Sequence, residues 1–233
     1  MKVIILAGGL GTRMDEETES KPKPMVLIDD KPILWHIMKI YASQGFKDFV
    51  IATGYKSEVI DEWVNNLNED WQVSTLFTGL NTQTGGRIKQ VISVYDSDAY
   101  LATYGDGLGN INLEKLINFH RDHGKIATLT AVRPPARFGY LNLQGNQVVR
   151  FGEKSQLEVG WINGGFFVFN RQISHYIESS DEALERFAFP RLTDLGELMA
   201  SFHEGFWMPM DTRSERSILA TYSQSSPPPW LKR

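Results

Sequence analysis

The sequence predicts an α/β protein with a doubly wound, mostly parallel mixed sheet and a small β-rich elaboration. Three observations lead to this prediction. Short apolar, β-branched runs alternate with amphipathic segments as far as Val132. The loops between them are short, as in strand–helix–strand units. Past Pro134-Pro135 the pattern changes to short strands joined by turns. A sheet of this type places its ligands at the carboxyl ends of its strands.

The strands expected in the main sheet are apolar runs that end at a glycine or a polar turn. They are residues 3–7, 48–53, 73–78, 99–104 and 126–132. The expected helices each carry one apolar face. The first is capped by Asp29 and ends at Gly45, and the second is capped by Ser57 and runs to Leu67. Further helices are expected from Arg87 onward and over 112–123, 171–179, 193–202 and the residues after Thr212. In the first helix, Trp35 is expected in the core and His36 on the surface.

The β-rich elaboration should contain a hairpin, because residues 140–143 and 148–151 flank a Gln-Gly-Asn turn. A strand over 161–170 is interrupted by Asn163, Gly164 and Gly165. Glycine inside a strand indicates a bulge or a close approach to a ligand. After residue 223 an extended, proline-rich tail can be ordered only by packing, for which Trp230 is the candidate.

Composition excludes several classes of protein. The chain has 233 residues, 42% of them hydrophobic, and a net charge of −4, so it is neither disordered nor attractive to nucleic acid or acidic lipid. The absence of cysteine excludes disulfides, thiolate metal sites and cysteine nucleophiles. No apolar run approaches the ~20 residues of a membrane span, and the first residues lack a cleavage region. We expect a cytoplasmic protein with neither a nucleic-acid nor a membrane partner.

The first strand leads into Gly8-Gly-Leu-Gly-Thr-Arg13. Three glycines leave several backbone N–H groups free to point at one anion, while Thr12 adds a hydroxyl and Arg13 a forked cation. Lys21 and Lys23 follow in a Lys-Pro-Lys-Pro frame. This combination predicts a phosphate-binding loop.

Two other glycine-rich loops can be weighed against it. A P-loop requires Gly-Lys-Ser/Thr, which this chain lacks. The dinucleotide pattern fits Gly9 and Gly11 and has an acid near the right distance in Asp29, but Met14 stands where its third glycine belongs. Prolines also interrupt the segment where a crossover helix should run. A nicotinamide oxidoreductase is therefore an alternative, though a disfavoured one.

Two acidic residues are candidate magnesium ligands. Asp106 lies between glycines at the carboxyl end of a strand, and Asp211 follows bulky apolar residues just before a helix cap. Mg²⁺ is suited to one or two carboxylates completed by phosphate oxygens and water. His120 and His123, at i and i+3, have a spacing that can bind metal, but their place near a helix end favours interaction with the helix dipole instead.

Four further sequence motifs follow the glycine loop and Lys23-Pro along the chain. They are Thr84-Gly-Gly-Arg87, Thr103-Tyr-Gly-Asp-Gly107, Ile162-Asn-Gly-Gly-Phe-Phe167 and Phe206-Trp-Met-Pro-Met-Asp-Thr212. Over nearly its whole length the chain resembles the sugar-phosphate nucleotidyltransferases, which have a Rossmann-like fold. The resemblance implies transfer of a cytidylyl group from CTP to a sugar 1-phosphate, glucose 1-phosphate first among them. The products are a CDP-sugar and pyrophosphate, formed by direct in-line displacement with Mg²⁺. It also implies a homo-oligomer.

The resemblance assigns roles to individual residues. Arg13, Lys23 and Lys154 are expected to be catalytic, and Asp106 and Asp211 to hold the metal. The nucleotide is expected to contact Leu6, Ala7, Gly8, Gly9, Gly11, Thr12, Arg13, Lys23, Thr84, Gly85, Gly86, Tyr104, Gly105 and Asp106. The glycines at 85 and 86 would let the flat base approach the backbone. The sugar phosphate is expected to contact Gly139, Glu153, Lys154, Asn163 and Gly164. The chain would be a single domain over 1–233, with a nucleotide part up to residue 133, a sugar-phosphate part over 134–212, and a C-terminal helix and tail over 213–233.

Two departures from the family pattern leave questions open. Ser155 stands where relatives have a proline after Glu-Lys, which bears on the acceptor. The segment between Leu67 and Thr84 is shorter than in relatives of the cytidylyltransferase type, which bears on the base and on subunit contacts. UTP, dTTP or GTP, another phosphorylated acceptor, and a non-catalytic nucleotide-sensing domain remain alternatives at this point.

Overall fold

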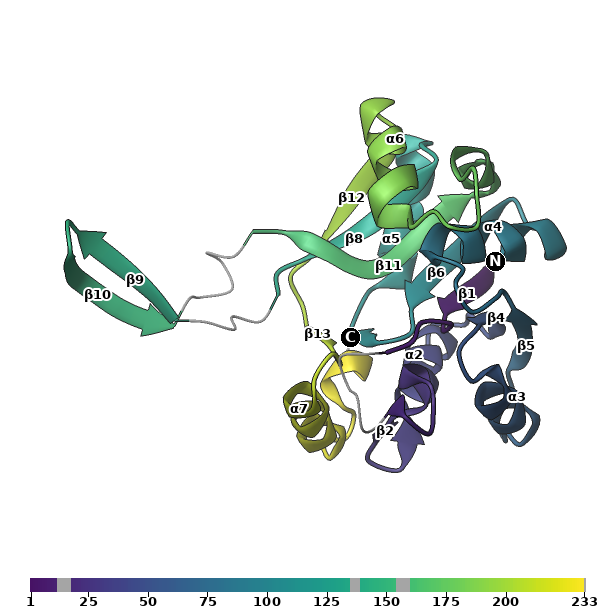
Figure 1. Cartoon of the computed structure of the whole chain (residues 1–233), viewed down its shortest axis with the longest axis horizontal. Coiled ribbons are helices and arrows are strands. Elements are labelled where there is room, and N and C mark those ends of the chain that lie inside the picture. The colour runs from purple at the N-terminus through teal and green to yellow at the C-terminus, as the bar shows by residue number, and fades with distance from the viewer. Residues whose placement is uncertain (12–17, 135–138, 154–159, 233) are drawn as a thin grey trace.

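A computed structural model describes residues 1–11, 18–134, 139–153 and 160–232 of the chain (Figure 1). Its centre is a seven-stranded sheet with the order β12-β8-β11-β6-β1-β4-β5. The strands are β1 (Lys2–Leu6), β4 (Asp48–Thr53), β5 (Gln72–Phe77), β6 (Ala99–Tyr104), β8 (Ala127–Val132), β11 (Ile162–Asn170) and β12 (Leu198–His203). Only β11 runs antiparallel to its neighbours, β6 and β8. The predicted mostly parallel mixed sheet is therefore confirmed.

Helices cover both faces of this sheet (Figure 1). They are α2 (Ile33–Ala42), α3 (Ser57–Asn65), α4 (Thr84–Val94), α5 (Leu113–His123), α6 (Phe189–Asp194) and α7 (Arg213–Ser223), with short turns η2 (Lys23–Met25), η4 (Arg171–Tyr176), η5 (Leu184–Ala188) and η6 (Pro229–Leu231). Alternate residues of β1 face opposite sides: Val3 and Ile5 belong to the core under α2, α5 and α7, while Ile4 and Leu6 belong to the core under α4 and α6. Two cores on the two faces of one sheet are the doubly wound arrangement.

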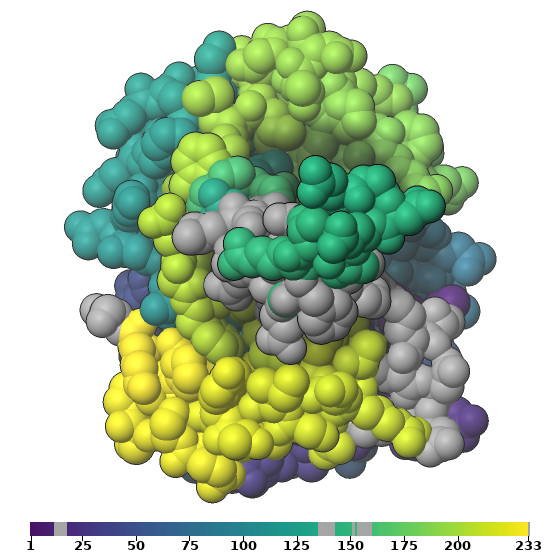
Figure 2. Space-filling view, turned by 90° about the vertical axis from the view of Figure 1, so that its left-hand side faces the viewer, coloured from purple at the N-terminus to yellow at the C-terminus, as the bar shows by residue number. Residues whose placement is uncertain are grey.

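Three strand pairs lie outside the main sheet. The first is a small hairpin of β2 (Leu27–Ile28) and β3 (Lys31–Pro32). The second is the predicted hairpin of β9 (Gly139–Gln144) and β10 (Gln147–Glu153), which stands away from the main sheet in Figure 1 and in front of it in Figure 2. The third pairs β7 (Gly107–Gly109) with β13 (Trp207–Pro209), antiparallel. That last pair joins segments about a hundred residues apart, and it positions the site described below.

Several local expectations were wrong. Asp29 does not cap α2, because it occupies the turn of the β2–β3 hairpin at φ 59°, a conformation that aspartate tolerates. Ser57 is the first residue of α3 and not its cap. Residues 193–202 are not a helix: α6 ends at Asp194, Gly196 turns the chain at φ 68°, and β12 then pairs with β8. Pairing at the open edge of the sheet overrides the helical pattern there.

The aromatic and histidine expectations were also partly reversed. His36 is buried and Trp35 only half-buried, because His36 packs edge-on against Trp230. Trp230 itself is buried, which agrees with the prediction that packing of this residue orders the proline-rich tail. His120 and His123 both bond to the Thr128 hydroxyl, and burial is the main cause that lowers the pKa of each, which opposes the cationic form that the helix dipole would favour.

No helix among the residues that the structure describes is both long and apolar enough to cross a membrane.

Candidate active site

A pocket of about 590 Å³ lies at the carboxyl ends of β1 and β6 and beside the start of α4. It is lined by Leu6, Ala7, Gly8, Gly9, Leu10, Gly11, Lys23, Pro24, Leu80, Asn81, Thr82, Gln83, Thr84, Arg87, Tyr104, Gly105 and Asp106. Ten of the residues predicted from the sequence to contact the nucleotide are in this lining, which brings together four separate segments of the chain. A larger cavity of about 750 Å³ lies between α5 and the tail, and the glycine loop does not contribute to it.

The glycine loop begins where β1 ends, and its path is determined by close packing. The Ala7 amide donates to the Ala52 carbonyl at 2.9 Å, so the chain leaves the sheet directly beneath the loop. Gly11 has φ 67°, a conformation that favours glycine. Thr12 and Arg13, predicted to complete the loop, lie outside the described residues. The part that is described already supplies the bare backbone that a phosphate requires.

Arg87 lies beneath this loop and was not among the predicted site residues. Its buried guanidinium donates to the carbonyl oxygens of Gly8 and Thr53, at 2.9 and 2.8 Å, and to the Thr78 hydroxyl. A Cβ at Gly8 would lie 2.0 Å from the Arg87 Nη1 atom, which is the physical reason for glycine there. Burial disfavours the charged form of Arg87 and so lowers its pKa. An anion bound at the loop would offset this cost, because its negative charge stabilises the guanidinium cation. The signal in the sequence was the arginine that ends Thr84-Gly-Gly-Arg87.

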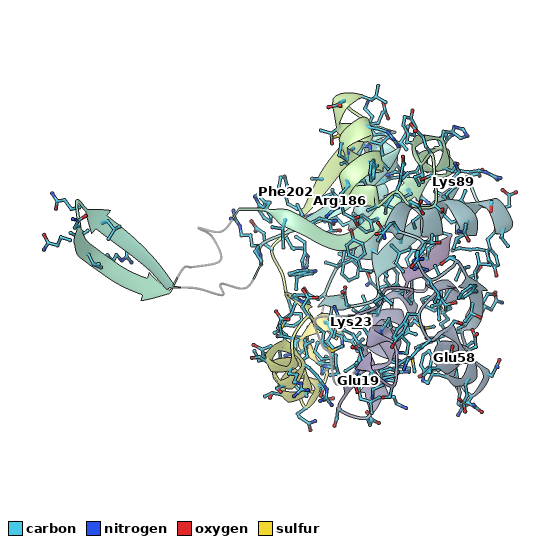
Figure 3. The ribbon with its side chains drawn as sticks, viewed as in Figure 1. Glu19, Lys23, Glu58, Lys89, Arg186 and Phe202 are labelled. Carbon is cyan, nitrogen blue, oxygen red and sulfur yellow. The ribbon has the colours of Figure 1, made fainter. Side chains whose placement is uncertain are left out.

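Lys23 brings the two predicted metal ligands together. Its Nζ atom lies 2.6 Å from Asp106 Oδ2 and 2.7 Å from Asp211 Oδ1. Lys23 lies in the short turn η2, and the flanking residues Pro22 and Val26 have an extended backbone conformation. Its burial acts to lower its pKa, but the two carboxylates outweigh that effect and the pKa is raised. Figure 3 labels Lys23 between the central strands and α7.

Strand pairing explains why Asp106 and Asp211 meet. Gly107 pairs with Pro209 in the β7–β13 ladder, and the Met210 amide donates to the Asp106 carbonyl at 2.8 Å. Asp211 is then held at the start of α7, where its amide donates to the Glu215 carboxylate at 2.8 Å. Thr212 and Glu215 form a capping box, so the predicted Thr212 cap is confirmed. Backbone structure on both sides thus determines the positions of the two acids.

This acidic pair fits a magnesium ion. Both carboxylates already converge on one cationic atom, the Lys23 ammonium. Mg²⁺ commonly takes one or two protein carboxylates and completes its shell with phosphate oxygens and water. No group of three or more acidic or histidine side chains gathers elsewhere in the described part of the chain as a competing metal site.

The glycines at 85 and 86 pack against another segment of the chain, and their predicted contact with the nucleotide stays a prediction. Neither lines the pocket. A Cβ at Gly85 would lie 2.5 Å from the Glu182 carbonyl oxygen, and one at Gly86 would lie 2.3 Å from that of Ser180. These glycines therefore let the segment 180–182 pack against the start of α4. The close approach that they allow is to the chain itself, and Thr84 and Arg87 are the residues of this block that line the pocket.

Two of the residues predicted to contact the sugar phosphate, Asn163 and Gly164, lie at the predicted bulge of β11. The Asn163 amide nitrogen donates to the Tyr104 hydroxyl at 2.9 Å, and the Trp207 indole donates to the Gly164 carbonyl at 2.8 Å. Gly139 and Glu153 are partners at the base of the β9–β10 hairpin. Lys154 lies outside the described residues, so its predicted role stays a prediction.

The chain is similar to known proteins both in sequence and in fold. The chain matches the model of the nucleotidyl transferase family over residues 2–218. It is 45% identical to a glucose-1-phosphate cytidylyltransferase from Salmonella typhi, with 99% of this chain and 98% of the relative covered. It is 39% identical to a probable glucose-1-phosphate cytidylyltransferase from Bacillus subtilis, with 91% and 92% covered. The crystal structure of HddC from Yersinia pseudotuberculosis superposes with a TM-score of 0.78 at 24% identity and shares the fold, covering 96% of this chain and 99% of that one.

The Salmonella alignment spans 253 positions for a chain of 233 residues, so it requires at least 20 gapped positions in this chain. That length is consistent with the shorter segment noted before Thr84. Spacing, fold and similarity over the full length agree with the arrangement of glycine loop, lysine and paired acids, and this chain belongs to the nucleotidyl transferase family.

Proposed function

We propose that this chain transfers a cytidylyl group from CTP to glucose 1-phosphate, giving CDP-glucose and pyrophosphate. The observation that supports the chemistry is the meeting of Lys23, Asp106 and Asp211 at the end of a pocket built on the glycine loop. The choice of CTP and glucose 1-phosphate is supported by the names of full-length relatives at 45% and 39% identity. Family membership disfavours the nicotinamide oxidoreductase considered from the sequence.

The reaction is a displacement at phosphorus. An oxygen of the sugar phosphate bonds to the α-phosphorus of CTP, the bond from that phosphorus to the pyrophosphate oxygen breaks, and pyrophosphate leaves with its electron pair. The attacking oxygen is already anionic, so no general base is needed. Holding two polyanions in line can remove roughly 7–11 kcal/mol of the barrier, which makes positioning the largest contribution.

The chain's own residues divide this work. The backbone of the glycine loop, with the Arg87 guanidinium below it, holds the triphosphate, and Arg13 contacts the leaving pyrophosphate. Lys23 is placed to move its ammonium from the carboxylates to the α-phosphate. Asp106 and Asp211 would hold Mg²⁺, which when bound neutralises charge on the phosphates. Lys154 holds the attacking phosphate, while Glu153, Asn163, Gly164 and Gly139 contact the sugar.

A matrix of nucleotides and acceptors tests this proposal. CTP, UTP, dTTP and GTP are each combined with glucose 1-phosphate, other sugar 1-phosphates and a phosphorylated polyol, and released pyrophosphate is measured with Mg²⁺ and with EDTA. We expect the highest kcat/KM for CTP with glucose 1-phosphate, and no release with EDTA. A higher kcat/KM for another pair would replace the substrates, and no release from any pair would favour a nucleotide-sensing domain.

We also propose that the protein works in the cytoplasm, where CTP and sugar phosphates are available, and as a homo-oligomer. The apolar side chains of Leu143, Val148 and Val149 are exposed on a two-stranded hairpin, an element that is marginally stable alone in water. Cell fractionation and light scattering on the purified protein test these two statements. A monomer at micromolar concentration would contradict the second.

A further inference from the structure

Glu185 is an acidic residue that the sequence analysis did not single out. It lies on η5, a single turn of π-helix, and such turns often occur at functional sites. Its carboxylate does not line the pocket. It is exposed and lies between Thr84 at the start of α4 and Tyr104 at the end of β6, and it accepts hydrogen bonds from both.

One oxygen of Glu185 determines the orientation of Thr84. The Thr84 hydroxyl donates to Glu185 Oε2 at 2.9 Å and accepts from the Leu184 amide at 2.9 Å. A hydroxyl has one proton, so donation to Glu185 leaves only acceptor capacity toward Leu184, and both contacts are satisfied together. Thr84 lines the pocket, so this contact holds the wall of the nucleotide side.

The other oxygen of Glu185 acts on the acceptor side through Tyr104. The Tyr104 hydroxyl donates to Glu185 Oε1 and accepts from the Asn163 amide at 2.9 Å. The Gly165 amide donates to Asn163 Oδ1 at 2.9 Å, which determines the orientation of the Asn163 side chain. Burial and the nearby Glu185 raise the pKa of Tyr104, so its hydroxyl keeps the proton that it donates.

The Tyr104 ring itself has little freedom to move. A Cβ at Gly165, where φ is 77°, would lie 2.4 Å from Tyr104 Cδ2, so glycine is needed for the chain to pass the ring. The edge of the ring also meets Phe167 with centroids 5.3 Å apart. Because the ring is held in place, Glu185 acts on the direction of the Tyr104 O–H bond, and that direction leaves the hydroxyl oxygen free to accept from the Asn163 amide.

We propose that Glu185 is a positioning residue that holds Thr84 on the nucleotide side and Asn163, through Tyr104, on the acceptor side of one site. This inference rests on the proposed function, because it takes Asn163 as a contact of the sugar. A carboxylate is required at this position since two donors approach it from two directions. Glutamine has one carbonyl oxygen and can accept from only one of them in this way.

The test is a double-mutant cycle on kcat/KM for glucose 1-phosphate, with the variants Glu185→Gln, Tyr104→Phe and both together. Each single change should lower this value by about tenfold, the effect of losing one hydrogen bond to a charged group. The loss should fall mainly on KM for the acceptor. The double variant should also lose about tenfold and not a hundredfold, because the two changes break one chain of contacts.

Two further readouts separate positioning from general damage. The KM for CTP should rise more in Glu185→Gln than in Tyr104→Phe, because only the first change releases Thr84. Arg186→Ala is the matched control. Arg186 is exposed on the same turn, and among the described residues its side chain makes no hydrogen bond or ion pair, so the kinetics of the variant should equal those of wild type (Figure 3). Losses that multiply in the double variant, or a Glu185→Gln protein with wild-type constants, would overturn the inference.

The two proposals fail in different ways. A wild-type protein that releases no pyrophosphate from any nucleotide and acceptor refutes the proposed function. A wild-type protein that is active, with variants that keep its acceptor KM, refutes only the role of Glu185. Thermal unfolding of each variant shows whether it is folded, and the near-isosteric Glu185→Gln and Tyr104→Phe changes keep the packing of the site.

Discussion

Replacing Asp106 with asparagine tests the centre of the proposed site. The change keeps the shape of the side chain and removes one negative charge. Lys23 then loses one of its two charge-assisted hydrogen bonds, the one of 2.6 Å, and keeps the bond of 2.7 Å to Asp211. The proposed metal site loses one of its two carboxylates at the same time.

The expected effects on stability and on rate differ greatly in size. A hydrogen bond to a charged group contributes about 1.5–3 kcal/mol, but the Asp106 side chain is 33% exposed, so solvent screening reduces this to about 1 kcal/mol. For a chain of this size that corresponds to a fall of about 2–4 °C in Tm. Removing a group that stabilises charge in the transition state costs about 10²–10³ in kcat, or about 2.7–4 kcal/mol. A loss of 1 kcal/mol leaves a protein of ordinary stability folded, so unfolding cannot account for the slower rate.

The assay is pyrophosphate release by the purified Asp106→Asn variant at saturating CTP and glucose 1-phosphate, with Tm measured on the same sample. Asp211→Asn should show a loss of similar size. Asp122→Asn, an exposed aspartate on α5, is the matched control and should behave as wild type. Wild-type pyrophosphate release by Asp106→Asn would refute the assignment of Asp106 to the metal.

Three further changes give separate tests. Lys154→Ala should lower kcat/KM for the acceptor far more than it weakens CTP binding measured by calorimetry, and equal losses would reject its contact with the attacking phosphate. Gly86→Ala places a Cβ 2.3 Å from a carbonyl oxygen and should cost about 1–3 kcal/mol in denaturant unfolding, whereas Gly9→Ala, with nothing within 4 Å, should cost little; similar values would contradict the packing argument. The pKa values of His120 and His123 are lowered in the folded protein, so below about pH 6.5 the unfolded chain binds more protons than the folded one. The free energy of unfolding should therefore decrease as the pH is lowered. His120→Gln should make Tm less sensitive to pH between 7.5 and 5.5, and an unchanged slope would show that other groups cause it.

Much of the fold followed from patterns within short segments. The runs that became β4 and β6 were predicted at their observed bounds, because a buried parallel strand is a continuous apolar run. The α5 helix was predicted over 112–123 and is observed over Leu113–His123, since its apolar face and the glycine after its end are local signals. Where a distant partner decided the outcome, local patterns failed, as in residues 198–203, which became a strand by pairing with β8.

The site shows the same division. Residue types and spacing identified the glycine loop, Lys23 and Asp106 as components of phosphate and metal chemistry, and the family resemblance added Asp211. Only the tertiary structure decided that Lys23 lies between the two acids, because that meeting depends on β7 pairing with β13 across about a hundred residues. The same holds for Arg87 under the glycine loop and for Glu185 between Thr84 and Tyr104. A sequence shows which groups are available, but their distances arise from pairing and packing between segments remote in the chain.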